Sequence, residues 1–160
     1  MLMLNNLSGF GTGSNVLAAF PVVESITQTT VSVAATSHLI SMPATVNAGD
    51  LLLMLLVIDS GTITAPGGWT KLFEGAQGTI LKLACFIKNA AGTEGGTTVD
   101  VVTSTSQKAT AQCYRVTSWF GALAGVEAAT AVAAGTADPN PPSLTPSWGA
   151  RNTLWIACLG

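Results

Sequence analysis

The only histidine of the chain, His38, is the first residue to consider for nucleophilic catalysis, because imidazole is the usual general base near neutral pH. Ser37 and Ser41 lie close to it in the sequence. A serine nucleophile often occupies a Gly-x-Ser-x-Gly turn, and the chain contains no such motif. The spacing identifies no nucleophile and base, so we predict no catalytic residue and a protein that is not an enzyme.

The eight carboxylates could supply acid–base chemistry, but they are dispersed at about one per loop or strand end. They are Glu24, Asp50, Asp59, Glu74, Glu94, Asp100, Glu127 and Asp138. A catalytic pair would have to be assembled by folding alone. Asp50 follows Gly49, and Glu94 precedes two glycines, so we interpret both as turn residues that accept hydrogen bonds from nearby backbone N–H groups.

Metal and cofactor chemistry finds little support in the remaining polar motifs. Cys85, Cys113 and Cys158 form no Cys-x-x-Cys pair, and their apolar surroundings predict buried, reduced thiols. The segment 138–140, Asp-Pro-Asn, is too short to indicate a calcium-binding loop, which needs several convergent oxygen ligands. We therefore predict no metal site and no cofactor.

A glycine cluster near the N-terminus invites comparison with phosphate-binding loops. Gly9, Gly11 and Gly13 do not have the spacing of a dinucleotide-binding loop, no strand precedes them, and no Gly-Lys-Ser/Thr sequence follows. We interpret residues 1–19 as an extended arm. Its apolar side chains Leu2, Leu4, Leu7 and Phe10 cannot bury themselves locally, which predicts docking on a partner protein.

Aromatic side chains offer the remaining binding chemistry, because they stack on sugar rings and anchor protein interfaces. Trp69 follows a Pro-Gly-Gly turn and Trp155 lies in an apolar run, so we predict that both anchor the core or a turn. Trp119, Phe120 and Trp148 lie beside loops and are the predicted surface contacts. A contact with another subunit and a contact with a glycan both remain open for them, and we favour the subunit.

Charge and hydropathy exclude two classes of partner. Only 9% of the residues are charged, and six Lys or Arg against eight Asp or Glu leave a net charge of -2 without a basic patch for nucleic acid. The longest apolar run, 51–58, is far shorter than the about 20 residues of a membrane-spanning helix. We predict neither nucleic-acid binding nor a membrane span.

The elements that must position these residues are short strands rich in Val, Ile and Thr, separated by Gly and Pro. Strands are predicted over 20–36, 51–60, 70–73, 79–90, 97–107, 108–119 and 152–160. The run 51–58 does not alternate, which predicts a strand buried on both faces. In 79–90, we predict that Leu81, Leu83, Cys85 and Ile87 face the core while the face of Lys82 and Lys88 points away. No segment predicts more than a short helical turn, the best being 121–135.

This pattern predicts an all-β fold, an antiparallel β-sandwich of jelly-roll type over 20–160, preceded by the arm 1–19. An apolar strand at 152–160 would end the sheet at a free terminus. Either this strand pairs as the last strand of the sheet or the domain is truncated and the chain continues beyond Gly160.

A series of motifs resembles a recurring β-sandwich domain of tailed-bacteriophage virion structural and tail-fibre-like proteins. In order, the motifs are AGDLLL at 48–53, PGGW at 66–69, AAGTE at 90–94, Tyr114-Arg115, and NPPSLTPSW at 140–148 followed by LWIA at 154–157. They cover the chain from about Phe20 to Gly160 and define a packing scheme rather than a reaction.

The resemblance implies a virion structural protein, most simply a tail-fibre-like or fibre-anchoring subunit held through the N-terminal arm. A capsid decoration or head-fibre protein and a carbohydrate-binding module for host recognition are the alternatives. The implied partners are other virion proteins, further copies of the chain with a trimer favoured, and a host-surface glycan. The implied location is the virion, assembled in the cytoplasm of the host bacterium.

Overall fold

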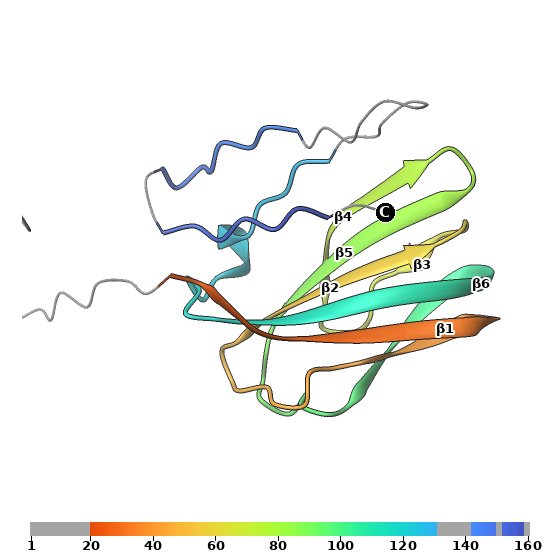
Figure 1. Cartoon of the computed structure of the whole chain (residues 1–160), viewed down its shortest axis with the longest axis horizontal. Coiled ribbons are helices and arrows are strands. Elements are labelled where there is room, and N and C mark those ends of the chain that lie inside the picture. Colours follow the sequence, from red (N-terminus) through yellow and green to blue (C-terminus); the bar gives the residue numbers. More distant parts are fainter. Residues whose placement is uncertain (1–19, 131–141, 150–151, 159–160) are drawn as a thin grey trace, which may run out of the picture.

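The computed structural model describes residues 20–130, 142–149 and 152–158, and these form an all-β structure (Figure 1). The strands are β1 (Val22–Ser41), β2 (Leu51–Ile58), β3 (Ile63–Thr64), β4 (Thr70–Gln77), β5 (Leu81–Asn89) and β6 (Thr98–Thr117). One short 3-10 turn, η1 (Leu123–Gly125), is the only helical element of this part of the chain. The predicted all-β class is therefore confirmed, and over 121–130, the described part of the segment with the best helical pattern, there is no more than this one turn.

The six strands form a single antiparallel sheet in the order β1-β6-β2-β5-β4, with β3 paired to β6 off this path. Two of them, β1 and β6, are each 20 residues long and pair along most of their length. Their register shifts between Val31 and Ser37, where the ribbon turns back on itself. The Ser41 N–H donates to Thr29 Oγ1 at 2.9 Å, so the two halves of β1 face each other (Figure 1).

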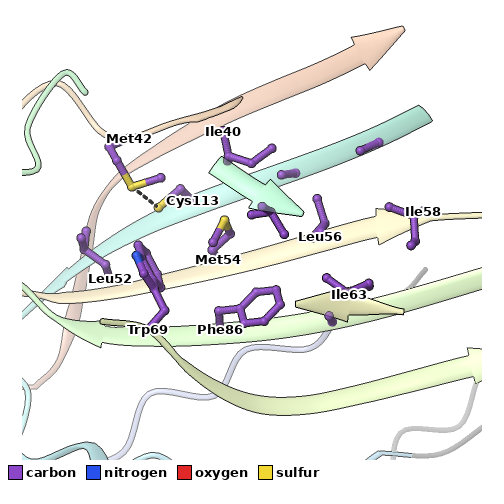
Figure 2. Close-up of a cluster of buried hydrophobic side chains, with 14 of the residues drawn as sticks. Ile40, Met42, Leu52, Met54, Leu56, Ile58, Ile63, Trp69, Phe86 and Cys113 are labelled. Carbon is purple, nitrogen blue, oxygen red and sulfur yellow. Dashed lines mark hydrogen bonds between the residues drawn. The ribbon is translucent and has the colours of Figure 1, made fainter. Parts of the chain in front are cut away.

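The main core fills the space between the two parts of this folded sheet. Its buried apolar members are Ile40, Met42, Val46, Leu52, Met54, Leu56, Ile58, Ile63, Trp69, Ala84, Phe86, Ala90, Val101, Ala109, Ala111 and Cys113. Figure 2 shows the side chains of β2, with Phe86 of β5, gathered beside Ile40 of β1 and Ile63 of β3. Because alternate residues of β2 point here, this strand supplies one whole face to the main core.

A second cluster covers the opposite face of β2 and β5. It contains Leu51, Leu53, Leu55, Cys85, Ile87 and Val116. Side chains from the segment after β6, including Trp119, Leu123 and Ile156, pack on this cluster without forming a strand. Both faces of β2 are thus covered, which confirms the prediction from its non-alternating sequence.

Among the details that differ from the sequence-based expectations, three concern how the strands pack and pair. Phe86 and Ala84 are fully buried in the main core, although we predicted that their face of β5 points away. The strands predicted over 97–107 and 108–119 are one continuous strand, β6. Residues 152–158 form no strand, because Ile156 and Cys158 pack on the face of the sheet rather than pairing with its edge.

Candidate functional site

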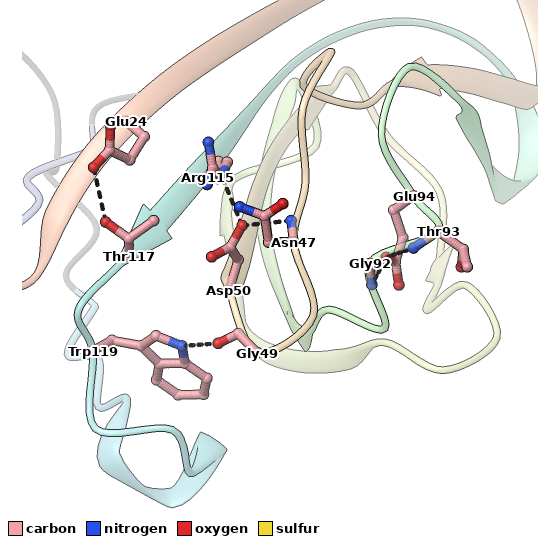
Figure 3. Close-up of polar contacts among 10 residues, drawn as sticks. All are labelled: Glu24, Asn47, Gly49, Asp50, Gly92, Thr93, Glu94, Arg115, Thr117 and Trp119. Atoms are coloured by element: carbon pink, nitrogen blue, oxygen red, sulfur yellow. Dashed lines mark hydrogen bonds and ion pairs between the residues drawn. The ribbon is translucent and has the colours of Figure 1, made fainter.

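Asp50 accepts a hydrogen bond from the backbone of its own turn, as the turn interpretation predicted. Its Oδ2 accepts hydrogen bonds from the Asn47 backbone N–H at 2.7 Å and from Arg115 Nε at 2.6 Å (Figure 3). Asp50 is buried, and the Arg115 side chain is largely so. The ion pair therefore fastens the loop before β2 to the end of β6, which is a structural use of both charges.

Glu94 holds the neighbouring loop in a similar way. Its carboxylate accepts hydrogen bonds from the backbone N–H groups of Gly92 and Thr93 at 2.9 and 3.0 Å (Figure 3). The Ala91 N–H also donates to it at 3.0 Å, and Lys88 Nζ lies 2.9 Å from it. Burial alone would raise the pKa of Glu94, but these N–H groups and the ammonium outweigh it and hold the pKa at about 2. A carboxylate with so low a pKa cannot act as a general acid near neutral pH.

The loops of Asp50 and Glu94 pack directly on each other. Gly49 N–H donates to Ala90 O, and Ala90 N–H donates to Asp50 O, at 2.9 and 2.8 Å. Gly92 has φ +88°, and a Cβ on it would lie 2.8 Å from the Ala48 nitrogen. Only glycine fits there, so the two motifs AGD and AAGTE form one cap at this end of the sheet.

Glu74 is a third carboxylate neutralised by neighbours. Its two oxygens lie 2.6 Å from Lys71 Nζ and 3.2 Å from Lys82 Nζ. Burial works to raise the pKa of Glu74, but the two ammonium groups lower it overall. Lys71 also donates to the backbone oxygen of Ile63 at 2.6 Å, so this group ties β4 to β3. Its charges are occupied in holding strands together.

His38 lies inside the folded sheet and away from the serines beside it in sequence. Its Nε2 is 3.0 Å from Thr103 Oγ1, and the Thr103 hydroxyl donates to Thr105 O at 2.8 Å. Because that hydroxyl hydrogen is used, Nε2 must carry the hydrogen donated to Thr103, which leaves Nδ1 as a buried acceptor without a hydrogen-bond partner. Ser37 instead donates to Asp100 at 2.7 Å, so the neighbouring serine and histidine form no nucleophile–base pair.

The cysteines are free thiols. Cys85 and Cys113 are buried as predicted, and burial raises the pKa of each to about 12, which makes them unreactive. Cys158 is partly buried. Within the described ranges, no three His, Cys, Asp or Glu side chains come close enough to hold a metal ion.

The predicted contact aromatics divide into two kinds. Trp119 and Trp148 are partly buried, and their indole N–H groups donate to Gly49 O at 2.6 Å and Thr153 Oγ1 at 3.4 Å. Phe120 is 71% exposed. Trp69 is buried as predicted, but Trp155, which we expected in a core or turn, is 59% exposed, so this expectation is wrong. No pattern in the residue types indicates that the segment of Trp155 lies over the sheet with its tryptophan outward.

The arm residues Leu2, Leu4, Leu7 and Phe10 lie outside the described residues. None of the helical structure in the described part of the chain is long and apolar enough to cross a membrane.

The most extended candidate contact surface is one that we did not single out from sequence, the free edge of β1. β1 ends the strand order, and within the described residues it pairs only with β6. The signal was present, because the segment 22–41 contains no Lys or Arg and a single acidic residue, Glu24. Unpaired backbone N–H and C=O groups along such an edge are able to bind another strand.

Comparisons with known proteins give no functional assignment, so the function is inferred from the geometry described above. No family model matches the chain, and no curated protein and no solved structure was found to match it.

Proposed function

We propose that this chain is a non-enzymatic structural protein of a tailed-phage virion, a tail-fibre-like or fibre-anchoring subunit. A capsid decoration or head-fibre subunit is the nearest alternative within the same class. The protein would be made in the bacterial cytoplasm and act in the assembled particle. Its partners are other virion proteins and further copies of itself, and the resemblance favours a trimer.

The order of the strands is the observation that carries this proposal. The first half of β1 lies beside the second half of β6, followed by β2 and β5, while the second half of β1 lies beside the first half of β6 and β3. A jelly-roll sandwich requires two facing layers with this strand order. The order fits when β1 and β6 each contribute one half to each layer. Jelly rolls are widely used as capsid and lectin domains.

The placement of the motifs gives a second line of support. The AGD motif contributes Asp50 and the Tyr-Arg motif contributes Arg115, which pair at 2.6 Å. The AAGTE motif contributes Glu94 and its glycine to the adjoining loop. The residues that carry the resemblance therefore hold the loops and the end of the core, as expected of a packing scheme shared by building blocks.

In this proposal the arm 1–19 attaches the domain. Ordering the arm on a neighbouring protein would bury Leu2, Leu4, Leu7 and Phe10 and contribute about 6–10 kcal/mol before the cost of ordering the chain. Several copies in one particle would reinforce each attachment.

The test is incorporation into particles. The host that carries the gene would produce either the wild-type chain or a chain lacking residues 1–15, and particles would be purified from each lysate. The copy number of the chain per particle would be measured by quantitative mass spectrometry. We expect many copies of the wild-type chain and loss of the shortened chain. Circular dichroism of the purified shortened chain controls for folding. A wild-type chain that is abundant in the lysate and missing from particles would contradict the proposal.

A carbohydrate-binding module is the second candidate, and the exposed rings of Phe120 and Trp155 favour it. Glycan-array binding of the wild-type chain, lost in both Phe120→Ala and Trp155→Ala, would support this function. Trp148→Phe is the matched control, because Trp148 is partly buried and hydrogen-bonded within the chain. Binding that survives both alanine substitutions would exclude these rings as the sugar platform.

A further inference from the structure

The free edge of β1 offers one regular stretch for pairing. Register with β6 is unbroken from Ser25 to Val31, between a bulge on one side and the turn of the ribbon on the other. Side chains in this stretch alternate between partly buried and exposed, with Ile26, Gln28 and Thr30 exposed. The stretch is therefore a straight strand with one edge paired to β6 and the other open within the described structure (Figure 1).

The Ser25–Val31 stretch of this edge lacks the features by which proteins usually prevent edge-to-edge association. Those features are charged side chains, proline and bulges within the exposed edge. From Val22 to Ser41 the only acidic or basic residue besides the buried His38 is Glu24. Glu24 is the extra residue between Val23 and Ser25 in the register, and its carboxylate accepts a hydrogen bond from Thr117 Oγ1 at 2.9 Å (Figure 3). The one charge is thus held over the protein's own sheet.

The opposite edge of the sheet, β4, has two of these protections, charged side chains and a bulge. It is 8 residues long and has a register shift between Lys71 and Phe73. It also carries both Lys71 and Glu74, with Lys82 of β5 beside them. A strand added at β4 would have to pair next to this bulge and these charges, so the two edges differ sharply in their ability to accept a partner.

From this asymmetry we propose that two copies of the chain pair through the Ser25–Val31 segments of β1, antiparallel and about a two-fold axis. The sequence is self-complementary in this arrangement. With the axis at Gln28, Ile26 faces Thr30 of the second copy and Thr27 faces Thr29, pairs of β-branched residues that suit adjacent strands. No like charges meet, because Glu24 lies beyond the paired stretch.

A closed dimer is favoured over open-ended assembly of many copies. The chain has a net charge of only -2, so two copies repel each other weakly. A two-fold contact uses the same edge on both copies and closes. Three-fold pairing through edges would need β1 of one copy against β4 of the next, and the bulge and charges of β4 oppose it. The inference therefore favours a dimer over the trimer that the resemblance implies, and it does not depend on the virion assignment.

The test is the mass of the full chain in solution by light scattering after size-exclusion chromatography. We expect twice the chain mass of 16.2 kDa. In Gln28→Lys, two ammonium groups would meet at the axis, and the dissociation constant should rise at least tenfold. Thr110→Lys is the matched control, because Thr110 is exposed on the neighbouring strand β6 and is not at the edge. It should remain dimeric.

Two further measurements keep the proposal open to refutation. Thr30→Glu, beside the axis and exposed, should also give monomers, and circular dichroism would verify that each variant is folded. A chain lacking residues 1–19 should stay dimeric. A monomeric wild-type chain, a dimer unaffected by both edge substitutions, or a dimer lost with residues 1–19 would each overturn the proposal, the last one in favour of the arm.

Discussion

The two faces of the β2–β5 pair are both apolar, but the molecule covers them by different means. The face with Leu52, Leu56 and Phe86 is covered by the folded-over halves of β1 and β6, whose backbones are hydrogen-bonded to each other. The face with Leu55 and Cys85 is covered by the segment after β6, which is mostly irregular. One cover is part of the sheet, and the other rests on it.

This difference teaches that burial and rigidity are separate properties. A cover fixed by a strand ladder cannot collapse when a side chain beneath it is shortened, so a cavity remains. An irregular cover has fewer backbone hydrogen bonds to lose and belongs to the parts of a protein that open locally at low cost. We expect the second cluster to tolerate changes that the main core does not.

The largest expected effect comes from a matched pair of phenylalanines. Phe86 is fully buried in the main core, whereas Phe73 is partly buried beside the second cluster. Phe86→Ala should lower the free energy of unfolding by about 3–5 kcal/mol and Phe73→Ala by about 1–2 kcal/mol. Urea unfolding followed by tryptophan fluorescence measures both. Equal losses in the two variants would contradict the expectation that the second cluster tolerates shortened side chains better than the main core.

A sharper form of the same test uses two adjacent leucines of β2. Leu56 is 0% exposed in the main core and Leu55 is 8% exposed in the second cluster, so their burial is almost the same. We expect losses of about 3–4 kcal/mol for Leu56→Ala and about 2–3 kcal/mol for Leu55→Ala, because the irregular cover can move toward the smaller side chain. A larger loss at Leu55 would refute this view of the cover.

Acid should weaken the end of the main core through Glu94. Its pKa is about 2 in the folded protein, below the ordinary value of 4.5, so the unfolded chain takes up the proton first as the pH falls. Stability is therefore present above pH 4.5 and lost between 4.5 and about 2, by up to about 3 kcal/mol from this group.

The Glu94 contribution can be isolated by subtraction. Other carboxylates also titrate in acid, so the measured quantity is the difference in unfolding free energy between wild type and Glu94→Gln at pH 5 and at pH 2.5. This difference should shrink as the pH falls. Lys88→Met is the control, because it removes the ammonium and retains the three backbone N–H donors, and it should keep part of the acid dependence. A difference that is constant with pH would contradict the role of Glu94.

Several features of the fold could be predicted because the sequence records them locally. The unbroken apolar run of β2 reflects burial on both faces, and the positions of Asp50 and Glu94 beside glycines reflect their bonds to backbone N–H groups three residues away or closer. Such interactions span a few residues, so the residue types alone reveal them.

Other features depend on partners that are distant in the chain. Lys82 and Lys88 made one face of β5 look solvent-exposed, yet they lie near the ends of the strand and reach Glu74 and Glu94, while Phe86 between them is in the main core. The segment with Trp155 has the apolar composition of a strand but lies on a sheet face. Composition specifies that such residues need a partner, and only the fold specifies which one.

The smallest expected effect is at His38, and it tests whether water reaches the interior on the side of the main core. Burial lowers the pKa of His38, although the negative charge of Asp100 works in the opposite direction. Protonation would place a hydrogen on Nδ1, for which the described structure offers no acceptor. The unfolded chain is protonated below its ordinary pKa of 6.5 while the folded protein resists, so stability present above pH 6.5 should decline as the pH falls below it.

Because His38 is the only histidine, its ring signals can be followed by NMR without assignment. We expect a titration midpoint below 6.5 and, at neutral pH, nitrogen shifts of the tautomer with hydrogen on Nε2, as the bond to Thr103 requires. Thr103→Val removes that acceptor and should disturb the tautomer preference, whereas Ser37→Ala, on the exposed side, should leave it unchanged. A midpoint at or above 6.5 would mean that water or charge reaches the ring, and that this side of the core is as loosely covered as the other.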